Sequence, residues 1–201
     1  MPDWDEDSPQ LRQNLGSLLR RLRTEARQRP KPSVESARSW HRESLQGLNV
    51  PDDAMVGRLR GEPGLEDVEV QIGAHRGVAS IDVAVAVSEF ERRLQLVVER
   101  LDTLIPVGLE LDTDQLAAVL DVCAWAHAEW VRIHPCANGN GRTARLWANS
   151  LAMRYGLPPF VRLRPRPDGG YVLSGQAAMQ GDWRPTAALF HRMLVETLRG
   201  E

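Results

Sequence analysis

The run of residues 112–131 constrains the fold of this chain more than any other stretch. Asp112 or Thr113 is placed to cap a helix start. The apolar residues of one stripe are Leu116, Val119, Leu120, Cys123, Ala126 and Trp130, and Ala117, Val122 and Ala124 fall on the other faces. A helix that is apolar nearly all round has to be buried. The sequence therefore predicts a buried central helix that leads the chain to His134.

A glycine-rich loop follows this helix. Residues 134–145 read His-Pro-Cys-Ala-Asn-Gly-Asn-Gly-Arg-Thr-Ala-Arg. Gly139 and Gly141 allow a tight turn and a close approach of the backbone to a ligand, because neither has a Cβ atom. The loop runs into the start of another helix, where unpaired N–H groups and the positive end of the helix dipole suit a phosphate.

Three charged or titratable residues accompany this loop. Arg142 and Arg145 stand three residues apart, so both can point to one side of the new helix. Guanidinium groups bind phosphate oxygens in a bidentate way. His134 is close enough to act on a ligand bound in the loop, although a histidine or an arginine pair outside such a pattern is more often structural or solvated. The pattern predicts an anion-binding turn with a base beside it.

The rest of the chain is predicted to be mostly helical, with one β-hairpin. Val68, Val70 and Ile72 alternate with polar residues, which is the period of a strand with one polar face. Residues 73–77 are expected to form the turn and residues 78–81 the return strand. Helical spacing of apolar residues predicts helices over about 9–27, 33–48, 87–101, 113–131 and 141–155, one from about 174, and one over about 186–198.

Composition limits the classes of partner. The net charge of −2 gives no general case for binding nucleic acid or a membrane surface. No apolar run approaches the ~20 residues of a membrane span, and the acidic start of the chain is no secretory signal. Cys123 and Cys136 are more typical of reduced thiols than of a disulfide. We expect a cytoplasmic protein with no nucleic-acid or membrane partner.

The loop resembles the signature of the Fic (Fic/Doc, Fido) family. That signature has a histidine, usually Pro-Phe, any residue, an acidic residue and then Gly-Asn-Gly-Arg-x-x-Arg. Other segments are similar to the family too: Trp40-His41-Arg42, Gly57-Arg58-Leu59-Arg60, Val70-Gln71-Ile72-Gly73 and Tyr155-Gly156-Leu157-Pro158-Pro159. The resemblance covers roughly residues 33–195. It implies an all-α Fic fold, in which a central helix–loop–helix carries the motif and a small β-hairpin forms a flap.

The resemblance also implies a domain division and an activity. Residues 1–32 would be an N-terminal extension, partly helical, and residues 33–201 the Fic domain. The activity would be transfer of AMP from ATP to a Ser, Thr or Tyr hydroxyl of a target protein, with His134 as the catalytic general base. The nucleotide and phosphate ligands would be Asn138, Gly139, Asn140, Gly141, Arg142 and Arg145. The flap residues Val70, Gln71, Ile72, Gly73 and His75 would bind the target segment by strand addition.

Two positions depart from the family pattern. Asn138 stands where the family has the acidic residue associated with Mg²⁺. An amide keeps one carbonyl ligand without the charge, so Asn138 is expected to bind Mg²⁺ weakly or to alter the chemistry. Cys136 replaces a packing phenylalanine. A thiol nucleophile is the other reading of Cys136, but His134 already has a task, so packing is the prediction.

Several alternatives stay open on the sequence. The chain could be a Fic-fold enzyme that transfers UMP, phosphate or phosphocholine. It could also be a weakly active or non-catalytic nucleotide-binding module of the toxin–antitoxin kind, inhibited by a separate antitoxin or an inhibitory helix. Within the chain, residues 39–44 come nearest to the inhibitory pattern, with Glu43 as the acid that would inhibit Arg145, and fail at Ser44. His127 is predicted to be a hydrogen-bonded core residue. Four tryptophans are also predicted to belong to the core: Trp40, Trp125, Trp130 and Trp147.

Overall fold

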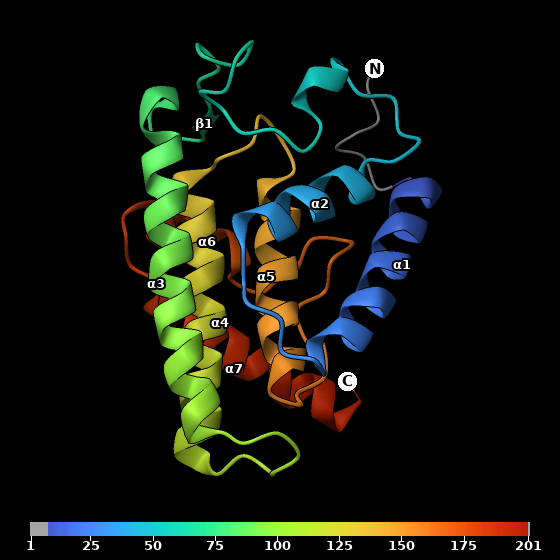
Figure 1. Ribbon diagram of the computed structural model, residues 1–201, viewed down its shortest axis with the longest axis vertical. Helices are drawn as coiled ribbons and strands as arrows, with labels where there is room; N and C mark the ends of the chain where they lie inside the picture. The colour runs from blue at the N-terminus through green and yellow to red at the C-terminus, as the bar shows by residue number, and fades with distance from the viewer. Residues whose placement is uncertain (1–7, 201) are drawn as a thin grey trace.

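Helix α4 (Thr113–Ile133) lies in the middle of a bundle of helices in the computed structural model, which describes residues 8–200 (Figure 1). It contacts α3, α5, α6 and α7. The other helices are α1 (Pro9–Ala26), α2 (Val34–Ser44), α3 (Val83–Leu104), α5 (Asn140–Arg154), α6 (Tyr171–Met179) and α7 (Arg184–Arg199). Among the described residues the only strands are the two of a short hairpin. The predicted all-α class with a β-hairpin is confirmed.

The central helix begins and ends where local chemistry dictates. Asp112 accepts a hydrogen bond from the Gln115 backbone, and the Gln115 side chain accepts one from the Asp112 backbone, so the two form a capping box. At the other end, His134 takes a left-handed conformation with φ 53° and ψ 55°, which stops the helix. Since only a few non-glycine residues adopt this conformation, the backbone at His134 needs support from its surroundings.

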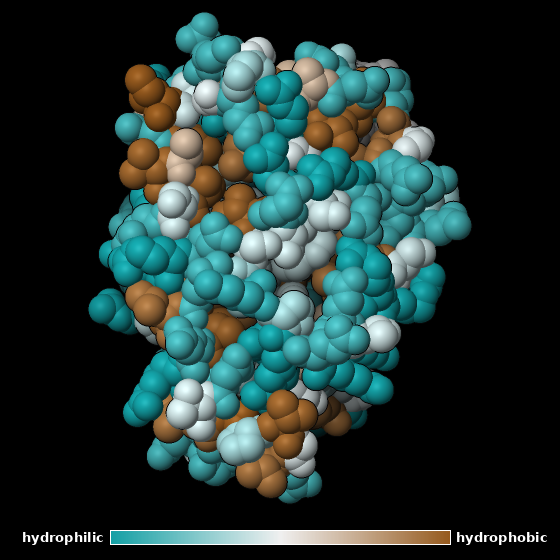
Figure 2. Space-filling view, viewed as in Figure 1, coloured by the Kyte–Doolittle hydropathy of each residue, from teal (hydrophilic) through white to brown (hydrophobic). Residues whose placement is uncertain are grey.

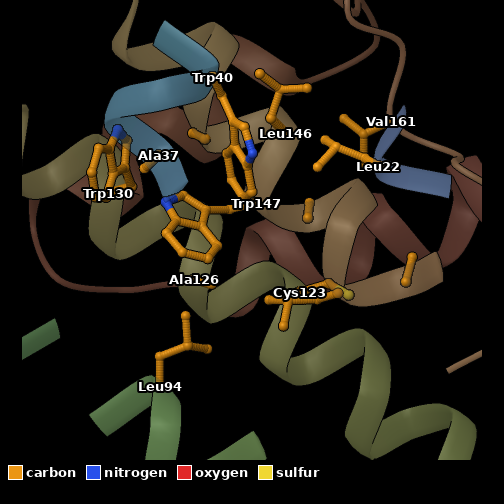
Figure 3. Packing of buried hydrophobic residues seen from close by; sticks show 14 of the residues in the cluster. Leu22, Ala37, Trp40, Leu94, Cys123, Ala126, Trp130, Leu146, Trp147 and Val161 are labelled. Carbon is orange, nitrogen blue, oxygen red and sulfur yellow. The ribbon is translucent and has the colours of Figure 1, made fainter. Parts of the chain in front are cut away.

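Aromatic side chains fill the core beside α4. Trp130 and Trp147 are 0% and 2% exposed, and Trp40 packs edge-on against Trp147 with ring centroids 4.8 Å apart (Figure 3). Phe90 of α3 stacks against Trp125 at 5.5 Å and meets Trp130 at the same distance. The prediction that these tryptophans belong to the core is confirmed.

Helix α1 shares this core. Its apolar stripe is buried against α2 and α5. The residues of the stripe are Leu11, Leu15, Leu18, Leu22 and Ala26. Residues 9–26 therefore bury their apolar surface in the same core as the rest of the bundle. The domain boundary expected at residue 32 stays a prediction.

Several predicted boundaries were wrong by a turn or less. Helix α2 ends at Ser44 rather than near residue 48, because the chain turns away through Gly47 at φ 74°. Helix α6 begins three residues earlier than expected, after Gly170 at φ 97°. Helix α3 extends beyond the predicted 87–101 at both ends, from Val83 to Leu104.

The hairpin is shorter than predicted. Strands β1 (Gln71–Ile72) and β2 (His75–Arg76) pair antiparallel, with Ile72 opposite His75. The predicted turn over 73–77 and return strand over 78–81 were wrong. Gly73 at φ 60° allows a two-residue turn, and residues 80–82 form a 3₁₀ helix. Val78 instead donates its N–H to the Ile133 carbonyl, 3.2 Å away, so the segment after β2 follows the end of α4.

The hairpin and the α4–α5 loop lie at the same end of the bundle (Figure 1). At the opposite end, Leu104, Val107 and Leu109, at and after the end of α3, are exposed. Figure 2 shows hydrophobic patches at both ends of this face, among mostly hydrophilic residues. Within residues 8–200, every helix is too short or too polar to cross a membrane.

Candidate active site

A cavity of about 550 Å³ opens between the α4–α5 loop, the hairpin and α6. This volume falls within the usual range for small-molecule sites. Most of the predicted site residues line it: His134, Asn138, Gly139, Asn140, Gly141, Arg142, Arg145, Ile72, Gly73 and His75. Val70 and Gln71, also predicted, do not. Gln71 is exposed and donates to the Gly73 carbonyl at 2.9 Å.

Another cavity, of about 330 Å³, lies between α1, α2 and α5 and contains none of the loop residues. Its charged side chains largely pair with one another. Arg21 binds Glu25 at 2.5 Å, and Arg42 binds Glu35 at 2.7 Å. The cavity at the loop is therefore the better candidate for an anion.

Asn140 holds the loop in shape. Its side chain is buried, accepts a hydrogen bond from the Cys136 N–H at 2.8 Å and donates one to the Cys136 carbonyl at 2.7 Å. Gly139 precedes α5 at φ 77°, a conformation that glycine adopts without strain. The Asn140 side chain is thus engaged within the loop, and its backbone N–H belongs to the first turn of α5, where helical N–H groups have no helical partner.

His41 of α2 ties this loop to the rest of the fold, and sequence reasoning assigned it no role. Its Nδ1 accepts the Gly57 N–H at 2.9 Å. Its Nε2 therefore carries the proton and donates to the Asn138 carbonyl at 3.0 Å. Burial, with smaller contributions from Arg142 and Arg42, lowers the pKa of His41 to about 4. His41 stays neutral near pH 7, and this tautomer secures the Asn138–Gly139 peptide.

His134 is oriented as a base. Its Nδ1 lies 3.1 Å from the Val131 carbonyl, which can only accept, so Nδ1 carries the proton and Nε2 keeps its lone pair. Burial lowers the pKa of His134 to about 4, and the positive charge of Arg60 adds to this effect. The imidazole is therefore neutral near pH 7, and Nε2 can accept a proton from a group in the cavity.

Arg60 supports the backbone at His134, and it too was given no role from the sequence. Its side chain is 0% exposed. It donates to the carbonyls of His134 at 2.8 Å, Ile133 at 3.1 Å and Val78 at 2.6 Å. It also donates to the Val68 carbonyl at 3.2 Å and to Glu69 at 3.4 Å. Arg60 thus joins the residues on either side of the hairpin to the C-terminal end of α4.

Arg145 is held from α6. Its Nη1 donates to the Tyr171 hydroxyl at 3.0 Å and its Nη2 to the Leu163 carbonyl at 3.1 Å. The Tyr171 hydroxyl also lies 2.7 Å from Nε2 of His127. His127 is 1% exposed, so the prediction of a hydrogen-bonded core histidine is confirmed. Burial first, and Arg145 second, lower its pKa to about 3. Tyr171 gave no signal in the sequence.

The cavity is strongly positive. Four arginines line it: Arg142, Arg145, Arg164 and Arg166. No aspartate or glutamate lies among the described residues that line it, and no cluster of three or more potential metal-ligating side chains occurs within residues 8–200. The Asn138 side-chain oxygen accepts the Gly139 N–H. The residues present therefore fit an anion and do not fit a divalent cation, whose usual protein ligands are carboxylates.

Neither Cys136 nor Glu43 lines the cavity. Cys136 is 1% exposed and burial raises its pKa to about 12, so it packs as a thiol, as predicted. Both described cysteines are unpaired thiols. Glu43 accepts hydrogen bonds from Arg21 at 2.6 Å and Ser39 at 2.9 Å. Its carboxylate thus faces α1, and the sequence alternative in which it inhibits Arg145 gains no support from these contacts.

Proteins of one family resemble this chain. The family model described as "Fic/DOC family" matches residues 32–152. A protein adenylyltransferase Fic from Drosophila erecta is 35% identical over 117 residues, which are 58% of this chain and 20% of that protein. The chain thus matches about a fifth of the length of this curated relative.

Two solved structures share the fold. A Fic domain containing signaling protein from Bacteroides thetaiotaomicron matches with a TM-score of 0.61 and 18% identity, over 96% of this chain and 73% of that one. BepC from Bartonella tribocorum, with bound AMPPNP, matches with a TM-score of 0.60 and 17% identity, over 96% of this chain and 90% of that one. At these identities the likeness concerns the fold alone.

Proposed function

Because the chain belongs to the Fic/DOC family, we propose that it is a nucleotidyltransferase that moves AMP from ATP to a Ser, Thr or Tyr hydroxyl of a target protein. One observation carries the proposal. His134 offers a neutral Nε2 to a cavity whose floor is the start of a helix with two buried arginines. A base and an anion site side by side are what such a transfer requires.

The residues have separate tasks in this reaction. The hydroxyl oxygen of the target attacks the α-phosphorus of ATP and forms a new P–O bond, while the bond to the β-phosphate oxygen breaks and pyrophosphate leaves. His134 Nε2 takes the hydroxyl proton. The N–H groups at the start of α5, with Arg142 and Arg145, stabilise the charge on the phosphates. We assign no step to Mg²⁺, since the cavity lacks the carboxylates that would hold it.

The hairpin is suited to present the target. Ile72, Gly73 and His75 line the cavity, and β2 contacts α6 across it. The hairpin has only two strands, so an extended segment of the target can add to its free edge through backbone hydrogen bonds. Gln71 and Val70, which do not line the cavity, would contribute backbone hydrogen bonds to the added segment.

One wall of the cavity includes apolar side chains of α4 and α6, which suit a nucleobase. Val131 of α4 and Val172 and Met179 of α6 lie there, with Gln176 as the polar residue among them. Such a wall buries a flat ring without a strong polar preference. Transfer of UMP, phosphate or phosphocholine therefore remains the competing enzymatic proposal.

A screen of donors by intact-protein mass spectrometry tests the proposal. The wild type and His134→Ala are incubated with ATP, UTP or CDP-choline, and the mass gained by the protein or by targets in a lysate is measured. We expect the increment of AMP, from ATP only, and none in His134→Ala. An increment of UMP, phosphate or phosphocholine would replace the AMP assignment by the corresponding one.

A second candidate function is that of a toxin controlled by a separate antitoxin. It is favoured by the position of Glu43, because no described carboxylate of the chain reaches the cavity and inhibition would then come from another protein. Co-expression with a helix that carries a glutamate for Arg145 should suppress transfer.

The cytoplasmic location and the absence of nucleic-acid and membrane partners stay predictions.

A further inference from the structure

We propose that this cavity binds its nucleoside triphosphate as the metal-free anion, with Arg164 and Arg166 supplying the positive charge that a divalent cation supplies in other nucleotide sites. The inference rests on the proposed function, since it concerns the same ligand. Beyond the proposed function, it names the species that is bound and the residues that replace the cation.

The lining of the cavity carries a net positive charge. Mg²⁺ is usually bound through one or two carboxylates together with substrate phosphates. Here four guanidinium groups and no carboxylate line the described cavity. An ATP molecule without metal carries more negative charge than its Mg²⁺ complex, so it gains more from these groups. A bound divalent cation would be repelled by each of them.

Asn138 stands at the position where a metal ligand is expected. Both oxygens of Asn138 already accept hydrogen bonds within the fold. The side-chain oxygen accepts the Gly139 N–H. The backbone carbonyl accepts the Nε2–H of His41 at 3.0 Å. A cation would find only the second lone pair of either oxygen, and it would gain a neutral amide ligand rather than a carboxylate.

The two additional arginines come from a separate element of the fold. Arg142 and Arg145 belong to α5, whereas Arg164 and Arg166 stand on the segment between α5 and α6. Arg164 is partly buried and Arg166 is exposed at the cavity mouth. The phosphates thus meet cations from two separate elements. Bidentate guanidinium–phosphate contacts can also orient the leaving pyrophosphate.

Calorimetric titration of ATP into the full chain, in EDTA and in millimolar Mg²⁺, tests this inference. We expect the wild type to bind ATP in EDTA at least as tightly as in Mg²⁺. Asn138→Asp should reverse the order, with binding at least about tenfold tighter in Mg²⁺ than in EDTA. Arg166→Gln should weaken binding in EDTA by about tenfold.

Arg162→Gln is the matched control for Arg166→Gln. Arg162 lies on the same segment but outside the cavity, where it faces Asp168 at 3.5 Å. Its substitution should leave ATP affinity unchanged. Binding of ATP by the wild type only in Mg²⁺, or equal losses in both arginine variants, would overturn the inference and leave the proposed function standing. Absence of ATP binding in the wild type and in Asn138→Asp under both conditions would overturn the proposed function itself.

Discussion

At the scale of single residues, the site depends on side chains that hold the backbone rather than on those that face the ligand. His134 has a left-handed backbone, and Arg60 bonds to its carbonyl and to the carbonyl before it. His41 bonds to the carbonyl of Asn138. A cation beside the last carbonyls of a helix also complements the helix dipole. The backbone of the base is therefore supported by Arg60, and the anion-binding loop by His41 together with Asn140.

Arg60→Met tests this support. The substitution leaves buried carbonyls without donors, so we expect the free energy of unfolding to fall by about 3–5 kcal/mol. The charge of Arg60 also helps to lower the pKa of His134. Its loss should raise that pKa, and the acidic limb of the transfer rate should move to higher pH. Urea unfolding and a pH–rate profile measure the two effects.

Two further variants distinguish the loss of the Arg60 contacts from a general loss of stability. Arg58→Met removes a nearby arginine whose Nη2 binds the Pro63 carbonyl at 2.6 Å, away from His134. It should leave the pH–rate profile unchanged. Arg60→Lys keeps the positive charge and can be assayed if Arg60→Met is too unstable. Because the charge is kept, the acidic limb of its pH–rate profile should stay near that of the wild type. An unshifted limb in Arg60→Met would show that Arg60 does not influence the base.

At the scale of elements, the hairpin is positioned by a glycine that permits close packing. A Cβ atom on Gly77 would lie 2.9 Å from the His134 Cβ, 2.9 Å from Val70 Cγ2 and 3.0 Å from Arg60 Nη2. Real Cβ atoms do not approach other atoms so closely, so any larger residue must displace the hairpin from the end of α4. The flap and the base are coupled through this contact.

Gly77→Ala should therefore separate target positioning from nucleotide binding. We expect transfer to a target to fall by about ten- to a hundredfold, because small misplacements of reacting groups have large effects on rate. ATP affinity should stay within about twofold of the wild type, because the loop itself is unchanged. Calorimetry and a transfer assay provide the comparison. A parallel loss of ATP affinity would mean that the hairpin and the loop are not separable.

Gly16→Ala is the control for the glycine substitution. Gly16 lies inside α1, and a Cβ there would meet only Arg20 Nη1, at 3.7 Å. The variant should be more stable by about 0.5–1 kcal/mol, since alanine loses less backbone entropy than glycine in a helix. Its transfer rate should match that of the wild type.

The elements also show which parts of the structure a sequence can predict. The central helix and the loop at 134–145 were predicted because their signals are local: apolar periodicity, a cap and two closely spaced glycines. The predicted turn and return strand were wrong because Val78, directly after Gly77, bonds to the distant end of α4. Arg60, His41 and Tyr171 were assigned no role because their partners stand far away in the sequence. No local pattern marks such contacts.

At the scale of the whole molecule, stability should depend on pH through buried histidines. The pKa values of His41, His127 and His134 are lowered to about 4, 3 and 4, chiefly by burial. In the unfolded chain they return to about 6.5. Below that pH the unfolded chain takes up protons that the folded chain does not, so stability is full above pH 6.5 and falls as the pH drops toward 4.

We expect the free energy of unfolding to fall by about 2–3 kcal/mol for each of the three histidines over this window. The total is a large part of the stability of a typical domain, so the midpoint of urea unfolding should move to lower urea concentration as the pH falls from about 6 toward 4. Urea unfolding at several pH values measures the slope. His41→Gln should reduce the slope, whereas His191→Gln, which changes an exposed histidine of α7, should not. A stability that is flat over this window would contradict the neutral, buried state of these side chains.

The central claim is that His134 and the loop after it transfer the α-phosphoryl group of ATP, with its nucleoside, to a protein. The most direct measurement compares ATP labelled at the α-phosphate with ATP labelled at the γ-phosphate, in the wild type and in His134→Ala. We predict that the α-label becomes covalently attached to protein in the wild type only, and that the γ-label is never attached. Attachment of the γ-label, or equal α-labelling by His134→Ala, would contradict the account.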